Sequence, residues 1–186
     1  LDIGALKGYV GLVRCVSKGW RDLIDGYFKS NSTQGWKRTS YQYLATSLSM
    51  CQWGFTTRFR INMSFINYVV SNGCLDILRW LSENKEKQLL KRIDDRVFNT
   101  AALFGKKHII AWIKDRYPNK YLQYRNLFDL SFHAVLGGHF HILEYTNELG
   151  LTVSPKAFYL IPSRGHLDML KWVVDKFTIE KRLIFW

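Results

Sequence analysis

A nine-residue motif recurs along the chain, and this repetition constrains the fold more than any other feature of the sequence. Its two clearest copies are GCLDILRWL at 73–81 and GHLDMLKWV at 165–173. Each copy begins with glycine, has an acidic residue three positions later, and continues with two apolar residues, a base, a tryptophan and an aliphatic residue. Weaker copies begin at Gly8, Gly105 and Gly138. A repeat with a period of about 20–50 residues is typical of a stacked array.

The spacing of the leading glycines predicts six units. Gly73, Gly105 and Gly138 are 32 and 33 residues apart, and the longer interval between Gly8 and Gly73 contains a degenerate copy at 40–48. With 186 residues, the chain has the length of one domain or one short array. The predicted units form a single array with the approximate boundaries 1–30, 31–63, 64–96, 97–129, 130–156 and 157–186. Because the chain begins with leucine rather than methionine, we expect it to be a fragment of a longer polypeptide.

Each unit is predicted to contain two short helices that meet at the glycine. Small or aliphatic residues precede the glycine, as Ala101 and Ala102 precede Gly105. After the glycine, apolar residues fall two, four, five and eight positions later, which is the spacing of one helix face. Glycine can adopt the left-handed conformation that ends the first helix and reverses the chain. Such a unit is too small to bury its own apolar face, so neighbouring units must stack and share a core.

An aromatic residue follows the glycine by seven positions in four of the units: Trp80, Trp112, Tyr145 and Trp172. A site for an aromatic ligand is one interpretation of this pattern. Recurrence in the same register favours another interpretation, in which the rings pack between successive second helices. We therefore expect the tryptophans to be largely buried, in one row along the array.

The period, the helix pairs and the Gly-His turn resemble ankyrin repeats. The form Gly-His-Leu-Asp-Met-Leu-Lys-Trp at 165–172 is similar to the divergent ankyrin repeats of large DNA viruses, and the resemblance covers nearly the whole chain. It implies an all-α solenoid of stacked helix-turn-helix repeats. It also implies a protein–protein interaction module, which binds a partner, here a host protein, on its concave face and on the loops between repeats.

Three features depart from the ankyrin pattern. The Thr-Pro-Leu-His motif of ordinary ankyrin repeats is absent, because other residues occupy its histidine position: Asn67, Asn99, Phe132 and Tyr159. Pro162 falls within the first helix of the last unit, where we expect it to kink or shorten that helix. The interval between Gly138 and Gly165 is only 27 residues, which leaves little room for a β-hairpin. We therefore expect short or missing β-hairpin fingers.

The start of the chain supports a second family resemblance. Residues 12–24, LVRCVSKGWRDLI, also resemble the second half of an F-box, the helical module that docks on a ubiquitin-ligase scaffold. The first half of an F-box, with its Leu-Pro opening, does not occur in the sequence. The register of Gly8 with the later glycines favours a repeat unit here, and a ubiquitin-ligase adaptor is kept as an alternative.

The sequence contains no catalytic motif that we recognise. The patterns Gly-x-Ser-x-Gly, Gly-x-Gly-x-x-Gly and Gly-x-x-x-x-Gly-Lys-Ser/Thr do not occur, so the common nucleophile-elbow and phosphate-loop signatures are missing. We interpret the pair Asp94 and Asp95 as charges at the start of a helix rather than as an acid–base pair. His139 and His141 are two residues apart, so on a helix their side chains diverge, which disfavours a metal site. We expect no enzyme activity, no metal and no cofactor.

Cysteine usage and hydropathy predict the compartment. Three widely spaced cysteines, Cys15, Cys51 and Cys74, do not form a disulfide framework, which indicates a reducing compartment, the cytoplasm or the nucleus. Each is interpreted as a small buried apolar side chain. The longest apolar run, 109–113, is far shorter than the roughly 20 residues of a membrane-spanning helix. We expect no membrane contact and favour a monomer.

The distribution of charge is the best sequence clue to a partner. The chain has a formal net charge of +12, which predicts an acidic partner. Between Gly26 and Leu75 there is no Asp or Glu, and basic residues alternate with aromatic ones. Such a segment is typical of a protein interface, and the alternatives are single-stranded nucleic acid binding or a solvated face. The candidate partner-binding residues are Trp36, Lys37, Arg38, Arg58 and Arg60.

Lys37, Arg38, Arg58 and Arg60 are predicted to lie near one another, because stacked units bring equivalent loops side by side. We expect the double variant R58E/R60E to associate more slowly with an acidic partner, since the attraction that speeds encounter is lost. Association rates measured by stopped flow check this, with urea unfolding as the control for an intact fold. An unchanged association rate, or side chains that point to opposite faces, would contradict the predicted patch.

Overall fold

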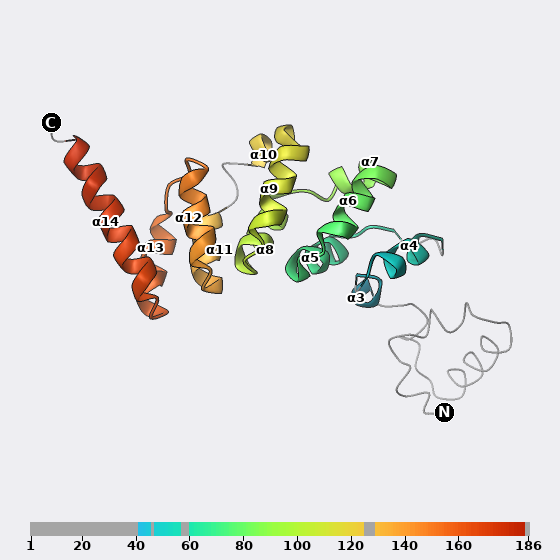
Figure 1. Ribbon diagram of the computed structural model, residues 1–186, viewed down its shortest axis with the longest axis horizontal. Helices are drawn as coiled ribbons and strands as arrows, with labels where there is room; N and C mark the ends of the chain where they lie inside the picture. Colours follow the sequence, from blue (N-terminus) through green and yellow to red (C-terminus); the bar gives the residue numbers. More distant parts are fainter. Residues whose placement is uncertain (1–40, 46, 57–59, 125–128, 185–186) are drawn as a thin grey trace, which may run out of the picture. The chain divides into compact units, whose positions relative to one another are not determined.

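The computed structural model describes most of the chain, namely residues 41–45, 47–56, 60–124 and 129–184 (Figure 1). These residues are mostly helical and contain no strand, so the predicted all-α class is confirmed. Over the same residues, no helix combines the length and the apolar character that crossing a membrane requires. The chain divides into two compact units, Leu1–Arg60 and Ile61–Trp186, each of which is described by itself.

In the first compact unit, the described residues form two helices, α3 (Tyr41–Leu44) and α4 (Leu48–Thr56), which contact each other. Leu44 and Cys51 are buried. Gly54 lies against the Leu44 side chain so closely that a Cβ at this glycine would be 2.9 Å from the Leu44 Cδ2. This close packing explains a glycine within α4. Whether these helices are the predicted second unit of a six-unit array stays a prediction.

The second compact unit contains four consecutive helix pairs (Figure 1). In each pair, a first and a second helix flank one of the predicted turn glycines. The pairs are α5 (Met63–Asn72) and α6 (Leu75–Asn84), α8 (Asp95–Leu103) and α9 (Lys107–Arg116), α11 (Leu130–Gly137) and α12 (Phe140–Glu148), and α13 (Pro155–Ser163) and α14 (Leu167–Ile184). Two shorter helices, α7 (Glu86–Leu90) and α10 (Pro118–Tyr124), follow α6 and α9.

The four turn glycines of this unit adopt the left-handed conformation that the sequence predicts. Each has a positive φ: 76° at Gly73, 68° at Gly105, 75° at Gly138 and 71° at Gly165. At the first turn, the Gly73 amide donates to the Val70 carbonyl at 3.0 Å. The next amide, that of Cys74, donates to the Val69 carbonyl at 3.0 Å. These bonds end α5 as a glycine C-cap does. The predicted first turn, Gly8, lies outside the described residues.

Each first helix begins at a polar residue whose side chain accepts a hydrogen bond from an amide of the first turn. These N-cap residues are Asn62, Asp94, Asp129 and Ser154. Asp94 caps α8, and Asp95 lies in the first turn, where negative charge is favourable. The interpretation of this acidic pair as helix-end charge is therefore confirmed.

The core of the second compact unit follows the row of first helices. Successive first helices contact one another extensively, α5 with α8, α8 with α11, and α11 with α13, whereas the second helices contact one another less. On α8 four residues are buried: Val97, Phe98, Ala101 and Ala102. These residues form the apolar surface with which α8 contacts its own partner helix, α9, and the first helices of both neighbouring pairs, α5 and α11. Each internal pair is therefore part of a continuous core.

The first helices α8 and α11 approach closely where α11 ends. A Cβ at Gly137 would overlap the carbonyl oxygen of Leu103 on α8 and would also lie 2.8 Å from the His139 Cδ2. Gly137 does not belong to the glycines with positive φ. Glycine is therefore required at this position for space, whereas at the neighbouring Gly138 it is required for backbone conformation.

The connections between pairs contain no strand among the described residues, and short helices occupy two of them. Leu89 of α7 is fully buried, and Tyr121 of α10 is buried with its ring 6.1 Å from the ring of Phe98. Pro162 was expected to shorten the first helix of the last pair, α13. This expectation is wrong, because α13 has nine residues, as many as α8. Pro162 is the second-last residue of α13, so the missing amide disturbs only its final turn.

The aromatic row is less buried than the sequence predicts. Tyr145 is buried, whereas three rings are half-buried: Trp80, Trp112 and Trp172. Trp112 meets Tyr117 edge to face, with ring centroids 5.9 Å apart. Trp172 meets Phe140 of the preceding pair at 6.0 Å. Because the second helices contact one another less extensively than the first helices, these rings stay partly open to solvent.

We expect Gly137→Ala to destabilise the protein by about 3 kcal/mol, because the added Cβ must displace the backbone of α8. Gly165→Ala is the matched control, since a Cβ there meets nothing within 4 Å. Gly165→Ala should therefore lower the free energy of unfolding only by the cost of a left-handed conformation in a residue with a Cβ, roughly 1–2 kcal/mol. Urea unfolding of both variants checks this expectation. Equal losses of unfolding free energy would show that the close approach of α8 and α11 is not required.

Candidate interaction surfaces

The structure describes only one of the five predicted partner-binding residues. Arg60 is exposed, at the end of the first compact unit. The other four lie outside the described residues: Trp36, Lys37, Arg38 and Arg58. The predicted basic patch therefore stays a prediction.

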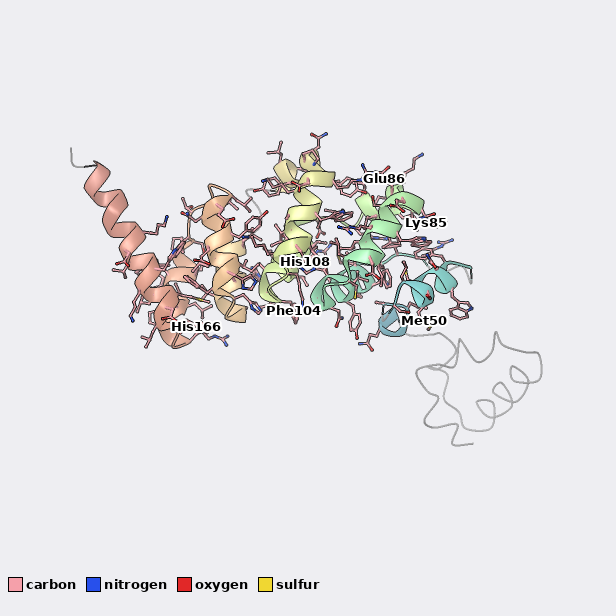
Figure 2. The ribbon with its side chains drawn as sticks, in the orientation of Figure 1. Met50, Lys85, Glu86, Phe104, His108 and His166 are labelled. Carbon is pink, nitrogen blue, oxygen red and sulfur yellow. The ribbon has the colours of Figure 1, made fainter. Side chains whose placement is uncertain are left out.

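One repeated contact joins each helix pair to the next. The residue after a turn glycine packs on the turn glycine of the preceding pair. A Cβ at Gly73 would lie 3.2 Å from the Lys106 Cδ, and a Cβ at Gly105 would lie 2.8 Å from the His139 Nδ1. A Cβ at Gly138 would lie 3.3 Å from the His166 Cε1. We call the surface formed by these turns and the residues that follow them the turn edge. Figure 2 shows His166 and Phe104 along this edge, away from Lys85 and Glu86.

Two histidines of the turn edge also bridge successive pairs. His108 Nε2 lies 3.2 Å from the Gly73 carbonyl oxygen, and His141 Nε2 lies 3.0 Å from the Gly105 carbonyl oxygen. Both histidines occupy the third position after their own turn glycine, His108 after Gly105 and His141 after Gly138. With a proton on Nε2, each ring donates to the carbonyl of the preceding turn glycine. The Gly73 carbonyl also accepts a hydrogen bond from the Leu75 amide at 2.9 Å. The sequence analysis missed this role, although the equal spacing from glycine was a signal for it.

His139 is a half-buried histidine of the turn edge. Its burial lowers its pKa, and the positive charges of His141 and Lys106 lower this pKa further. A hydrogen bond with the Leu103 backbone acts in the opposite direction. The rings of His139 and His141 are in edge contact, with centroids 5.7 Å apart. The expected divergence of these two side chains is wrong, because His139 is the N-cap of α12 rather than a residue within it.

The second-helix side carries cations beside aromatic rings. Lys107 of α9 lies 4.5 Å from the ring centroid of Tyr145 on α12, and its Nζ is 3.2 Å from the Glu148 Oε2. Arg116 Nε donates to the Ser82 Oγ at 3.3 Å, which joins α9 to α6. Exposed ion pairs and cation–π contacts of this kind contribute modestly to stability. This side of the helix pairs therefore holds neighbouring pairs together and has part of its charge already paired.

The outward face of the first helices has fewer charges. It contains the positions six and five residues before each turn glycine, which we call the first-helix face: Asn67, Tyr68, Asn99, Thr100, Phe132, His133, Tyr159 and Leu160. Seven of these side chains are half-buried, and Tyr159 is exposed. The Asn99 Oδ1 accepts a hydrogen bond from the Asp129 amide at 3.0 Å, which joins α8 to the start of α11. Polar and aromatic side chains in register thus form a half-exposed strip.

The described residues contain no group of three or more His, Cys, Asp or Glu that could hold a metal ion. Cys51 is buried, as the sequence predicts, whereas Cys74 is only half-buried. Burial raises the pKa of the Cys74 thiol, and the Asp76 carboxylate raises it further. Neither of these two cysteines is part of a disulfide bond. Cys15 lies outside the described residues.

We expect the stability of the protein to fall as the pH drops below about 6.5, the ordinary pKa of histidine, because of His139. Its pKa is lowered in the folded state, so the unfolded state binds more protons below that pH. The stability contribution is complete above the unfolded pKa and decreases as the pH falls through it. Unfolding free energies at about pH 7.5 and pH 5.5 measure this slope. His139→Gln should flatten the slope, and equal slopes in wild type and His139→Gln would contradict the expectation.

Comparison with known proteins finds no match for this chain. No protein-family model matches the sequence, and neither a curated protein nor a solved structure matches it. The resemblance to ankyrin repeats therefore depends on the residues of the repeat units themselves. Their register, their turn glycines and the contacts between pairs are the observations from which a function can be argued.

Proposed function

We propose that the protein is a non-enzymatic interaction module of the ankyrin-repeat type, which binds a protein partner on the first-helix face and on the connections between pairs. The observation that carries this proposal is the contact repeated at the turn edge. Lys106, His139 and His166, each the residue after a turn glycine, pack on the glycine of the preceding pair. A contact repeated in register is typical of arrays, in which each unit touches only its neighbours. Such arrays bind partners on extended surfaces.

The first-helix face is the expected concave side. First helices of successive pairs contact one another more extensively than second helices do. Small residues allow this approach, since Ala101 and Ala134, each four residues before its turn glycine, are fully buried. When the first helices of successive pairs are closer together than the second helices, the row of pairs curves with the first helices on its inner side, as in curved solenoids of stacked repeats. The strip from Asn67 to Leu160 would then line a concave surface.

An acidic protein is the partner that the charge distribution favours. The chain carries +12, and the connection after α6 exposes three cations, Lys87, Lys91 and Arg92. The first-helix face itself contains no Asp or Glu among its defined residues. A positive surface speeds the encounter with an acidic partner and discriminates against basic ones. The Tyr and Phe residues of the face, Tyr68, Phe132 and Tyr159, belong to the aromatic side chains that are enriched at interfaces.

Capture from host lysate, with and without nuclease, identifies the partner and separates this proposal from nucleic acid binding. Binding of the purified partner is then measured for Thr100→Glu on α8 and for the matched control Ala111→Glu on α9. Both positions are half-buried and belong to the same pair, but they lie on opposite helices. We expect Thr100→Glu to weaken binding roughly tenfold or more through like-charge repulsion, and the control to change it less than about twofold.

Three results would overturn this proposal. One is loss of the captured material on nuclease treatment. Another is an affinity that falls steeply and linearly on a log–log salt plot, which is the signature of phosphate contacts. The third is an equal effect of both Glu variants at unchanged folding stability. Thermal unfolding by circular dichroism checks that both variants fold.

A further inference from the structure

Two asparagines of the first-helix face turn their amide oxygens toward the protein. Asn67 on α5 and Asn99 on α8 are each six residues before a turn glycine, so they occupy equivalent positions of successive pairs. The Asn99 Oδ1 accepts a hydrogen bond from the Asp129 amide at 3.0 Å. The Asn67 Oδ1 is buried and accepts no hydrogen bond from the described residues. In both side chains the oxygen therefore lies on the inner side.

The amino groups of the same two side chains are available to a partner. Within the part of the chain that the structure describes, neither the Asn67 Nδ2 nor the Asn99 Nδ2 donates a hydrogen bond. Both side chains are only half-buried. Each amino group carries two N–H donors, and an inward oxygen leaves the nitrogen of the same amide on the open side. The first-helix face thus presents one pair of donors from each of two neighbouring helix pairs.

The spacing of the helix pairs determines which partner backbone these donors fit. Directly packed helices lie about 8–10 Å apart, and α5 packs on α8. A polyproline II segment has three residues per turn and rises about 3.1 Å per residue, so equivalent carbonyls recur about every 9.3 Å. A β-strand repeats about every 6.8 Å, and an α-helix uses its carbonyls for its own hydrogen bonds. Polyproline II is therefore the backbone whose free carbonyl oxygens match the two amino groups.

Aromatic rings occupy three of the four rows of the first-helix face. Tyr68 on α5 and Phe132 on α11 are half-buried, and Tyr159 on α13 is 78% exposed. Proline-rich segments dock on surfaces lined by aromatic side chains, and their preformed conformation lowers the entropy lost on binding. The rings thus favour the same kind of segment as the amino groups do.

Charge complementarity makes this segment acidic. The defined residues of the first-helix face contain no Asp or Glu. Lys156 is exposed three residues before Tyr159, so it lies on the same side of α13. A segment with acidic residues between its prolines is attracted to this surface, whereas a basic proline-rich segment is repelled.

We propose that the first-helix face binds an acidic, proline-rich segment of its partner in the polyproline II conformation. This inference rests on the proposed function and names the chemistry of the partner at the same site. The amino groups of Asn67 and Asn99 donate to backbone carbonyls one turn apart on the segment. The rings of Phe132 and Tyr159 pack on its prolines.

Fluorescence polarisation with labelled peptides and the full chain tests the proposal. The probe is a peptide of four Glu-Pro-Pro repeats, which forms polyproline II and carries acidic residues. Four Glu-Gly-Gly repeats have the same length and charge without the preformed conformation. A helix-forming peptide with the same number of glutamates is the second control. We expect the Glu-Pro-Pro peptide to bind at least about tenfold more tightly than either control, because its backbone is already ordered.

Asn99→Asp tests the donor role of the amide. Aspartate keeps an oxygen that can accept from the Asp129 amide, but it has no amino group. Thr100→Asp is the matched control, because it adds the same charge at the next residue of α8 and leaves the Asn99 amide intact. We expect Asn99→Asp to weaken binding of the Glu-Pro-Pro peptide about three- to tenfold more than Thr100→Asp does. Circular dichroism shows whether both variants fold, and Asn67→Asp replaces Asn99→Asp if the latter does not.

Equal affinities of the Glu-Pro-Pro and Glu-Gly-Gly peptides would overturn the proposal, because charge alone would then account for binding. So would tighter binding of the helical peptide, no binding of the Glu-Pro-Pro peptide up to about 1 mM, or equal effects of Asn99→Asp and Thr100→Asp. These results leave the proposed function standing if Thr100→Glu still weakens binding of the captured partner more than Ala111→Glu does. An equal effect of those two Glu variants on the captured partner removes the proposed function instead, whatever the peptides do.

Discussion

The second compact unit depends on one interaction, the packing of a side chain on the turn glycine of the preceding helix pair. The turn residue must have a positive φ to end one helix and start the next, and it must lack a Cβ so that a side chain of the following pair can lie on it. At Gly105, for example, the His139 ring occupies the space next to the missing Cβ. The same residue thus determines the shape of its own pair and the position of the next one. Repetition of this contact joins each of these pairs to the next at the equivalent residues.

The first helices carry most of the core because they are the helices that approach closely. Where Gly137 passes the Leu103 carbonyl, no side chain separates the two backbones, and the neighbouring alanines leave little volume between them. The second helices carry larger residues, and their rings meet edge to face, as Trp172 meets Phe140. This difference in side-chain size follows from the sequence, and it makes the two sides of the helix pairs unequal. One side is closely packed with few charges, and the other is looser and holds cations over rings.

The features of the fold that depend on local sequence could be predicted. Glycines in register, an N-cap such as Asp94, and apolar residues at helical spacing each act within one unit, so the sequence of a single unit reveals them.

The features that depend on contacts between units could not be predicted from the sequence. The bridging of His141 to the Gly105 carbonyl requires the preceding pair, and the burial of Leu89 in a short connecting helix requires the core beneath it. The tryptophans were expected to be more buried because recurrence shows a shared role but not the distance between the second helices. The predicted partner site at Lys37 and Arg58 depends on residues outside the described part of the chain.

The charge of the chain contributes little to its fold, and this leaves the charge available for function. Three side-chain ion pairs of the second compact unit, Arg96 with Asp94, Lys107 with Glu148 and Arg116 with Glu86, are all exposed to solvent on at least one partner. Exposed pairs of this kind are worth roughly 0–1 kcal/mol and are screened by salt. The apolar core along the first helices must therefore supply most of the stability. A rise in ionic strength would then weaken the attraction of the proposed acidic partner without loosening the stack, because the charges proposed to recognise that partner are not what holds the helix pairs together.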